Sequence, residues 1–180
     1  MKVTPLSIPD ILLIEPHIFE DSRGFFFESF REDIFRKETL LDVSFVQDNH
    51  SKSSKGVFRG LHYQLPPYAQ GKLVRVIQGE VFDVAVDLRK SSPNFGKHVS
   101  QILSAENKKQ MWIPEGFAHG FLTLSQTSEF LYKTTNFYNS EYERSIIWND
   151  ETLQVSWPKQ KIQLSSKDSS AKKFNDADFF

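Results

Sequence analysis

Alternation of side-chain character in the middle of the chain restricts the fold more than any other feature. Along residues 80–88, alternate side chains fall on opposite faces of an extended chain: Phe82, Val84, Val86 and Leu88 on one, and Val81, Asp83, Ala85 and Asp87 on the other. This period of two is typical of a half-buried β-strand. Gln78 and Gly79 supply a turn before the segment, and residues 91–94 supply one after it.

Short strand-like segments continue this pattern along most of the chain. We expect strands over residues 12–19, 25–30, 110–113, 116–124 and 129–135, an extended stretch over 43–49 and a flexible polar loop over 51–56. Residues 31–41 predict a helix, and the tail after Pro158 predicts loop and short helix. Short strands separated by turns indicate one all-β domain over residues 1–180, a barrel or sandwich with a few short peripheral helices.

Composition narrows the range of functions. The formal net charge is -1 without a long basic run, so we expect no nucleic-acid partner. The absence of cysteine excludes disulfides, thiolate metal ligands and a cysteine nucleophile. No apolar stretch approaches the roughly 18–20 residues that span a bilayer, and the apolar run at residues 11–14 is too short for a signal peptide. We therefore expect a cytoplasmic protein without a membrane partner.

Two histidines beside glycines are candidate catalytic side chains. His62 lies in Phe58-Arg-Gly-Leu-His-Tyr-Gln64, and His119 lies in Pro114-Glu-Gly-Phe-Ala-His-Gly120. Strand alternation would separate Arg59 from His62, unless Gly60 marks a bulge that re-aims one of them. Taken alone, each histidine is also compatible with a hydrogen-bonded structural role.

Lys72 and Tyr132 are polar side chains on otherwise apolar strand faces. Lys72 alternates with Val74 and Val76, so its amine either extends to water or serves an anionic group. The phenol of Tyr132 either packs in the core or acts as a general acid.

Several long blocks, in order, resemble the dTDP-4-dehydrorhamnose 3,5-epimerase family. They cover residues 58–64, 70–76, 79–89, 112–121 and 129–135, together with the early motifs Asp21-Ser-Arg-Gly24 and Gln47-Asp-Asn49. The resemblance implies a cupin jelly roll. It also implies a homodimer in which the N-terminal strands of one subunit complete the active site of the other, and no metal or other cofactor.

The reaction that the resemblance implies is inversion of C3 and C5 in dTDP-4-dehydro-6-deoxy-D-glucose, a dTDP-linked 4-keto-6-deoxy-sugar. The product is dTDP-4-dehydro-L-rhamnose, an intermediate of dTDP-L-rhamnose biosynthesis. Both carbons flank the C4 ketone, which acidifies their protons, so the chemistry needs a base, an acid on the opposite face and a cation at the enolate oxygen.

Residue roles follow from the same resemblance. It places both Arg59 and His62 inside the barrel, so we expect the bulge at Gly60. His62 is the expected base, Asp168 the carboxylate that orients it, and Tyr132 the acid. Lys72 is expected to stabilise the enolate oxygen. The expected substrate-binding residues are Arg23, Phe26, Glu28, Gln47, Asp48, Asn49, Arg59, Lys72, His119, Glu143 and Lys167.

Two other functional classes remain open on the sequence. Cupin metal sites use a His-x-His pair on one strand, but here the pair is His62-Tyr-Gln64, and glutamine is a poor ligand for transition metals. We therefore expect no metal site. A binding protein without catalytic activity would keep the same pocket, and relatives that invert a single carbon share much of the pattern.

Overall fold

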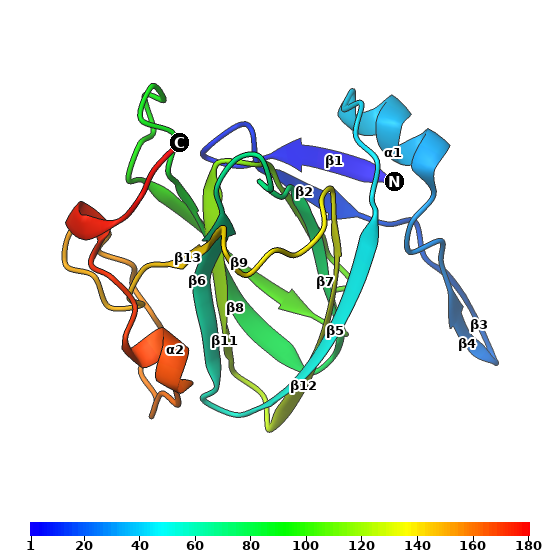
Figure 1. Ribbon diagram of the computed structural model, residues 1–180. Helices are drawn as coiled ribbons and strands as arrows, with labels where there is room; N and C mark the ends of the chain where they lie inside the picture. Colours follow the sequence, from blue (N-terminus) through cyan, green and yellow to red (C-terminus); the bar gives the residue numbers. More distant parts are fainter.

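Two facing antiparallel β-sheets make up the body of the protein, as the computed structural model of all 180 residues shows (Figure 1). The six-stranded sheet has the order β1 (Lys2–Pro5), β2 (Leu12–Glu15), β10 (Gln110–Ile113), β7 (Lys72–Gln78), β12 (Thr127–Thr134) and β5 (Gln47–Ser54). The five-stranded sheet has the order β13 (Glu143–Ser145), β6 (Phe58–Gln64), β11 (Phe117–Thr123), β8 (Glu80–Asp87) and β9 (His98–Ser104). The predicted all-β jelly roll is confirmed.

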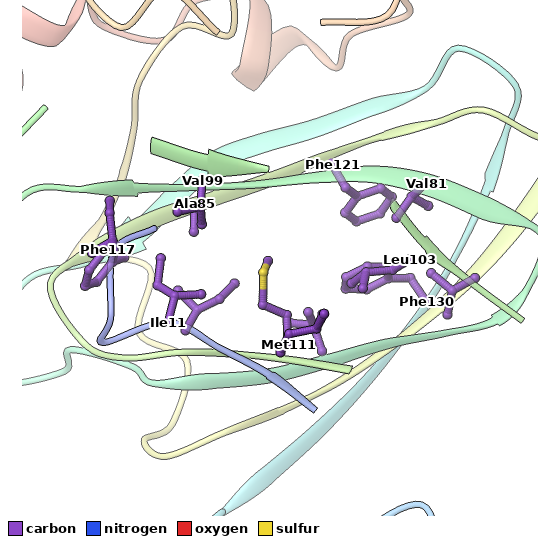
Figure 2. Packing of buried hydrophobic residues seen from close by; sticks show 14 residues of the cluster. Ile11, Val81, Ala85, Val99, Leu103, Met111, Phe117, Phe121 and Phe130 are labelled. Atoms are coloured by element: carbon purple, nitrogen blue, oxygen red, sulfur yellow. The ribbon is translucent and has the colours of Figure 1, made fainter. Parts of the chain in front are cut away.

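The main hydrophobic core lies between the two sheets (Figure 2). Both sheets contribute to it, as Figure 2 shows for Val81 and Ala85 of the five-stranded sheet and Met111 of the six-stranded sheet. Phe121 and Phe130 stack across the gap with ring centroids 4.3 Å apart and planes 11° apart. Their stacked rings form the apolar floor of the cavity described below.

A second core covers the outer face of the five-stranded sheet. The C-terminal segment, with α2 (Ser166–Ser169) and the 3₁₀ helix η1 (Phe174–Asp176), lies along this face (Figure 1). Phe174 is buried there against the sheet residues Val84, Val86 and Leu88. The prediction that residues 80–88 are half-buried was therefore wrong: the tail buries the apolar face, and the opposite face, which carries Asp83 and Asp87, is buried against the six-stranded sheet.

The segment of residues 30–45 packs on the outer face of the six-stranded sheet. Helix α1 (Glu32–Thr39) confirms the predicted helix, and its Phe35 packs edge-on against Trp112 of β10 with ring centroids 6.0 Å apart. No helix of the chain has the length and apolar character needed to cross a membrane.

Two expected strands are shorter in the structure. The segment 12–19 divides into β2 and β3 (Phe19–Asp21), because Pro16 has no N–H to donate to a continuous ladder. The segment 25–30 pairs only over β4 (Gly24–Phe26), since no strand of this chain lies beside residues 27–30. β3 and β4 form a hairpin that projects from the body at the lower right of Figure 1.

The polar loop expected over residues 51–56 was also wrong. β5 continues to Ser54, and its last residues pair with β12, including Ser51 with Phe130 and Ser53 with Ser128. Pairing with a neighbouring strand outweighs the low strand propensity of this polar segment. β5 therefore places Ser51 and Ser53 on the inner face of the sheet.

Candidate active site

A cavity of about 520 Å³ lies between the two sheets, with the C-terminal segment at its rim. Its volume falls in the range of small-molecule binding sites. Seven of the residues expected from the sequence line it: Arg59, His62, Lys72, His119, Tyr132, Lys167 and Asp168.

An irregularity in β6 brings Arg59 and His62 to the same cavity. His62 pairs with His119 of β11, whereas Arg59 pairs with Phe121, so three residue steps on β6 match two on β11. Gly60 lies at this shift with a φ of +141°, and an added Cβ there would come within 2.4 Å of the Gly120 Cα. The expected bulge is confirmed, and it requires glycine at both positions because their backbones touch.

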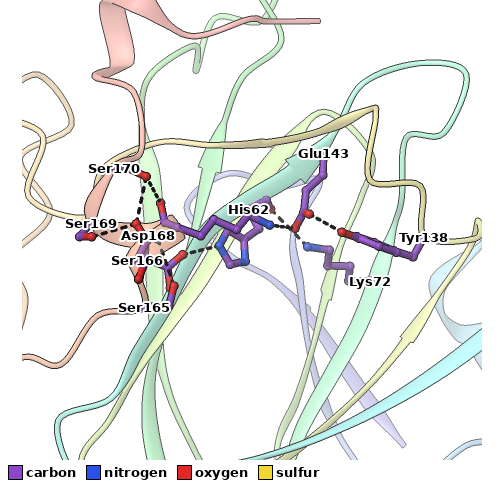
Figure 3. Close-up of polar contacts among 10 residues, drawn as sticks. His62, Lys72, Tyr138, Glu143, Ser165, Ser166, Asp168, Ser169 and Ser170 are labelled. Atoms are coloured by element: carbon purple, nitrogen blue, oxygen red, sulfur yellow. Dashed lines mark hydrogen bonds and ion pairs between the residues drawn. The ribbon is translucent and has the colours of Figure 1, made fainter.

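His62 is hydrogen-bonded to a buried carboxylate from the tail. Its Nε2 lies 2.6 Å from Asp168 Oδ1, and Ser165 Oγ donates to Asp168 Oδ2 at 2.8 Å (Figure 3). Burial works to raise the pKa of Asp168, but the hydrogen bonds from His62 and Ser165 outweigh it and hold the pKa below its usual value. An ionised carboxylate only accepts, so Nε2 carries the proton and Nδ1 is free to act as a base.

Lys72 reaches the cavity from β7 of the opposite sheet. The residue is only 8% exposed, and its Nζ donates to the backbone oxygen of His62 at 3.2 Å. Burial lowers the pKa of Lys72 to about 8, against the opposing attraction of Glu143 and Asp83. The amine therefore does not extend to water, and it is still mostly charged at neutral pH.

Tyr132 lines the cavity from β12, in the same sheet as Lys72. Burial, followed by the nearby charge of Glu143, raises the pKa of its phenol. Tyr132 is therefore protonated at neutral pH and can donate a proton. His62 and Tyr132 belong to opposite sheets, so a basic and an acidic group enter one cavity from two walls.

A second histidine–carboxylate pair lies deeper in the sandwich. His119 Nε2 is 2.9 Å and 3.0 Å from the two oxygens of Asp83, which is fully buried. Burial raises the pKa of Asp83, and the charge of His119 and its hydrogen bonds limit that rise. The pair places a polar imidazole, oriented by its bonds to Asp83, in the cavity wall.

A polar network lies beside the cavity rim (Figure 3). Glu143 of β13 accepts from Lys167 Nζ at 2.5 Å and from the Tyr138 hydroxyl at 2.6 Å. Burial opposes ionisation of Glu143, but these two partners hold its pKa below the usual value. Gln47 Oε1 accepts from the backbone N–H of Tyr138 at 3.0 Å, and Gln47 Nε2 donates to Asn49.

Comparison with known proteins identifies the family. The family model described as dTDP-4-dehydrorhamnose 3,5-epimerase matches residues 5–176. The chain belongs to this family. It is 61% identical over 180 residues to the dTDP-4-dehydrorhamnose 3,5-epimerase of Shigella flexneri, covering 100% of this chain and 99% of that protein. It is 60% identical over 181 residues to the enzyme of Pseudomonas aeruginosa, again covering 100% and 99%.

A solved epimerase structure has the same fold. The dTDP-6-deoxy-D-glucose-3,5-epimerase of Legionella pneumophila, determined in complex with dTDP-4-keto-L-rhamnose, superposes with a TM-score of 0.95 at 50% identity. The alignment covers 98% of this chain and 94% of that one. The family, the isomerase class and the 3,5-epimerase function expected from the sequence are confirmed by these matches.

Seven of the substrate-binding residues expected for an epimerase do not line this chain's own cavity: Arg23, Phe26, Glu28, Gln47, Asp48, Asn49 and Glu143. Arg23 pairs with Asp21 on the projecting hairpin, Phe26 is 65% exposed on the same hairpin, and Glu28 contacts Arg31. Asp48 is paired with Lys133, its cross-strand partner, and lines a separate hollow. Alternation along β5 places Asp48 on the opposite face of the sheet from Gln47 and Asn49.

Sequence reasoning missed three residues near the epimerase site. Asp83 carried a signal, since an acidic side chain on an apolar strand face needs a buried partner. Ser53, which accepts from Arg59 Nε at 3.0 Å, was assigned to a loop. Tyr138 gave no signal because its contact with Glu143 depends on how an irregular loop folds.

Gln64 is held by hydrogen bonds within this epimerase fold. Its side-chain amide is bonded to backbone groups of two loops, and no group of three or more His, Asp or Glu side chains lies close enough together to hold a metal ion.

Proposed function

We propose that this protein is the epimerase that converts dTDP-4-dehydro-6-deoxy-D-glucose into dTDP-4-dehydro-L-rhamnose in the cytoplasm, with residues 1–180 acting as one catalytic domain. The observation that carries the proposal is the placement of His62 and Tyr132 on opposite sheets around one cavity that also holds Lys72. Inversion at carbon requires removal of a proton from one face of the sugar and its return to the other.

A single base serves both carbons in this proposal. In a gluco-configured chair, the hydrogens on C3 and C5 are axial on the same face of the ring. His62, held by Asp168, therefore removes each in turn from one wall, and the resulting imidazolium is stabilised by the buried carboxylate.

The opposite wall provides the remaining chemistry. Removal of either proton moves negative charge onto O4, where the Lys72 ammonium stabilises the enolate. Tyr132 then delivers a proton to the other face of the carbon. Arg59 and Lys167 supply cations for the diphosphate, for which the planar guanidinium of Arg59 is well suited.

We further propose that the active form is a homodimer that shares residues between sites. Phe19, Phe25 and Phe26 on the β3–β4 hairpin are each more than half exposed, and Arg23 of the same hairpin is absent from its own cavity. Exposed aromatic clusters of this kind favour association. The hairpin of one copy would place Arg23, Phe26 and Glu28 against the substrate in the other, where Phe26 would stack on the thymine.

Proton exchange in D₂O tests the reaction. Metal-stripped protein is incubated with dTDP-4-dehydro-6-deoxy-D-glucose, and NMR follows C3 and C5 separately. We expect deuterium at both carbons with inversion, and no exchange at either carbon for His62→Ala. Exchange at one carbon would indicate a single-carbon epimerase, and binding without exchange would indicate a non-catalytic binding protein.

Mixing two inactive variants tests the shared site. His62→Ala and Arg23→Ala each disable a different part of the site, so mixed dimers regain one intact site only if the two residues come from different copies. Recovery of about a quarter of the wild-type activity is expected when the sites are shared. No recovery in mixed dimers would show that each copy uses its own Arg23.

A further inference from the structure

Gln64 lies two residues after the base on β6, and its side-chain amide is hydrogen-bonded to backbone groups only. The residue is 4% exposed. Its Nε2 donates to the oxygen of Tyr68 at 2.6 Å and to that of Phe137 at 3.1 Å, while its Oε1 accepts from the N–H of Asn139 at 2.7 Å. One amide thus bonds to the residues on both sides of Tyr138.

Only a glutamine meets this set of partners. Two carbonyl oxygens require two donors and one N–H requires an acceptor, which the carboxamide supplies from a single planar group. A histidine at this position has two ring nitrogens and cannot satisfy all three partners, and a glutamate has no donor when ionised. The donors and acceptor of Gln64 therefore fit the backbone groups of the loop and not a metal ion.

The loop residue that Gln64 brackets is connected to the cavity. Tyr138 keeps 55% of its surface exposed, yet its hydroxyl donates to Glu143 Oε2 at 2.6 Å, and this bond raises the pKa of Tyr138 to about 12. Glu143 in turn binds Lys167, which lines the cavity and precedes Asp168 in the chain. A continuous chain of contacts thus runs from Tyr138 through Glu143 to Lys167 at the cavity rim.

We propose that Gln64 is a positioning residue for nucleotide-sugar affinity, acting through the loop of Tyr138 on Glu143 and Lys167. The inference rests on the proposed epimerase function and assigns a task to a residue that touches neither substrate nor base. Because the base His62 is held independently by Asp168, loss of Gln64 weakens binding and leaves the chemical step intact.

The test compares Gln64→Met with wild type in two assays. Methionine has a similar volume and removes all three hydrogen bonds. We expect the Kd for dTDP, measured by calorimetry, and the KM for the dTDP-sugar to rise about tenfold or more, since several buried backbone groups lose partners. The exchange rate at saturating substrate should stay near the wild-type value.

Two further variants separate positioning from damage to the fold. Gln160→Met removes another glutamine-to-backbone bond, 2.9 Å to the oxygen of Thr123, outside this loop, and should leave Kd and KM unchanged. In a Tyr138→Ala background the effect of Gln64→Met on Kd should largely disappear, because the loop then has no hydroxyl to present to Glu143. Gln64→Glu, which keeps the acceptor only, replaces Gln64→Met if that variant does not fold.

The outcomes distinguish this inference from the epimerase function. Wild-type protein that neither binds dTDP nor exchanges protons would overturn the function itself. If the wild type is active, three results would each overturn the positioning role of Gln64. The first is an unchanged Kd in folded Gln64→Met, and the second is effects on Kd that simply add in the double variant. The third is a loss of the exchange rate at saturating substrate in Gln64→Met.

Discussion

Replacing Asp168 by asparagine removes the charge behind the base and keeps the size of the side chain. The His62–Asp168 hydrogen bond is 2.6 Å long, and the Asp168 side chain is only 4% exposed, so it is a charge-assisted bond with little screening. Such bonds contribute about 1.5–3 kcal/mol, which corresponds to a loss of about 10- to 150-fold in the rate of proton abstraction. Asparagine can also present its N–H₂ to Nε2, which favours the tautomer with Nδ1 protonated and blocks the base.

The rate is measured as deuterium uptake at C3 and at C5 under single-turnover conditions. Both rates should fall by the same factor, because one base removes both protons in the proposed mechanism. Ser166→Ala, on the same short helix and without a side-chain contact to His62, is the matched control and should keep the wild-type rate. A folded Asp168→Asn variant with an unchanged rate at either carbon would refute the assignment of a single oriented base.

Four further predictions rest on the same structure. The exchange rate should fall as pH rises through about 8, where buried Lys72 loses its charge, and Lys72→Arg should shift this fall to higher pH in a pH–rate profile. Since the folded-state pKa of Lys72 lies below its unfolded value near 10.4, this residue's contribution to the free energy of unfolding should rise between about pH 8 and 10, as denaturant titrations can measure. Tyr132→Phe should slow net inversion more than proton abstraction. Deuterium should then enter the carbon that His62 deprotonates at a higher rate than product forms. Gly60→Ala should lower the free energy of unfolding by about 2 kcal/mol or more, because its Cβ would meet Gly120 Cα at 2.4 Å, and a small loss in urea titrations would contradict this close approach.

The fold was largely predictable because its signals are local. Alternation along residues 80–88 and the apolar stripe of residues 31–41 each describe one element and its neighbours in the chain. The failures involve distant partners. The polar residues Ser51 to Ser54 become a strand only because β12 pairs with them, and the outer face of β8 is buried only because the tail lies across it.

The site residues show the same difference between local signals and distant partners. His62, Lys72 and Tyr132 lie on strands whose alternation marks a polar side chain among apolar ones, so their candidacy was visible in the residues themselves. Asp168 is 106 residues from His62, and only the family resemblance linked the two. The contact of Tyr138 with Glu143 depends on a loop without regular structure, which no periodic pattern describes.

The tail couples the stability of the fold to catalysis. The same segment that buries Phe174 against the five-stranded sheet carries Lys167 and Asp168 into the cavity. Phe174 is anchored further by its N–H, which donates to Asp150 Oδ2 at 2.8 Å. If this segment loosens locally, the base loses its carboxylate while the two sheets stay paired. Orientation of His62 therefore depends on an apolar contact far from the sugar, and activity should be lost in denaturant before the sandwich unfolds.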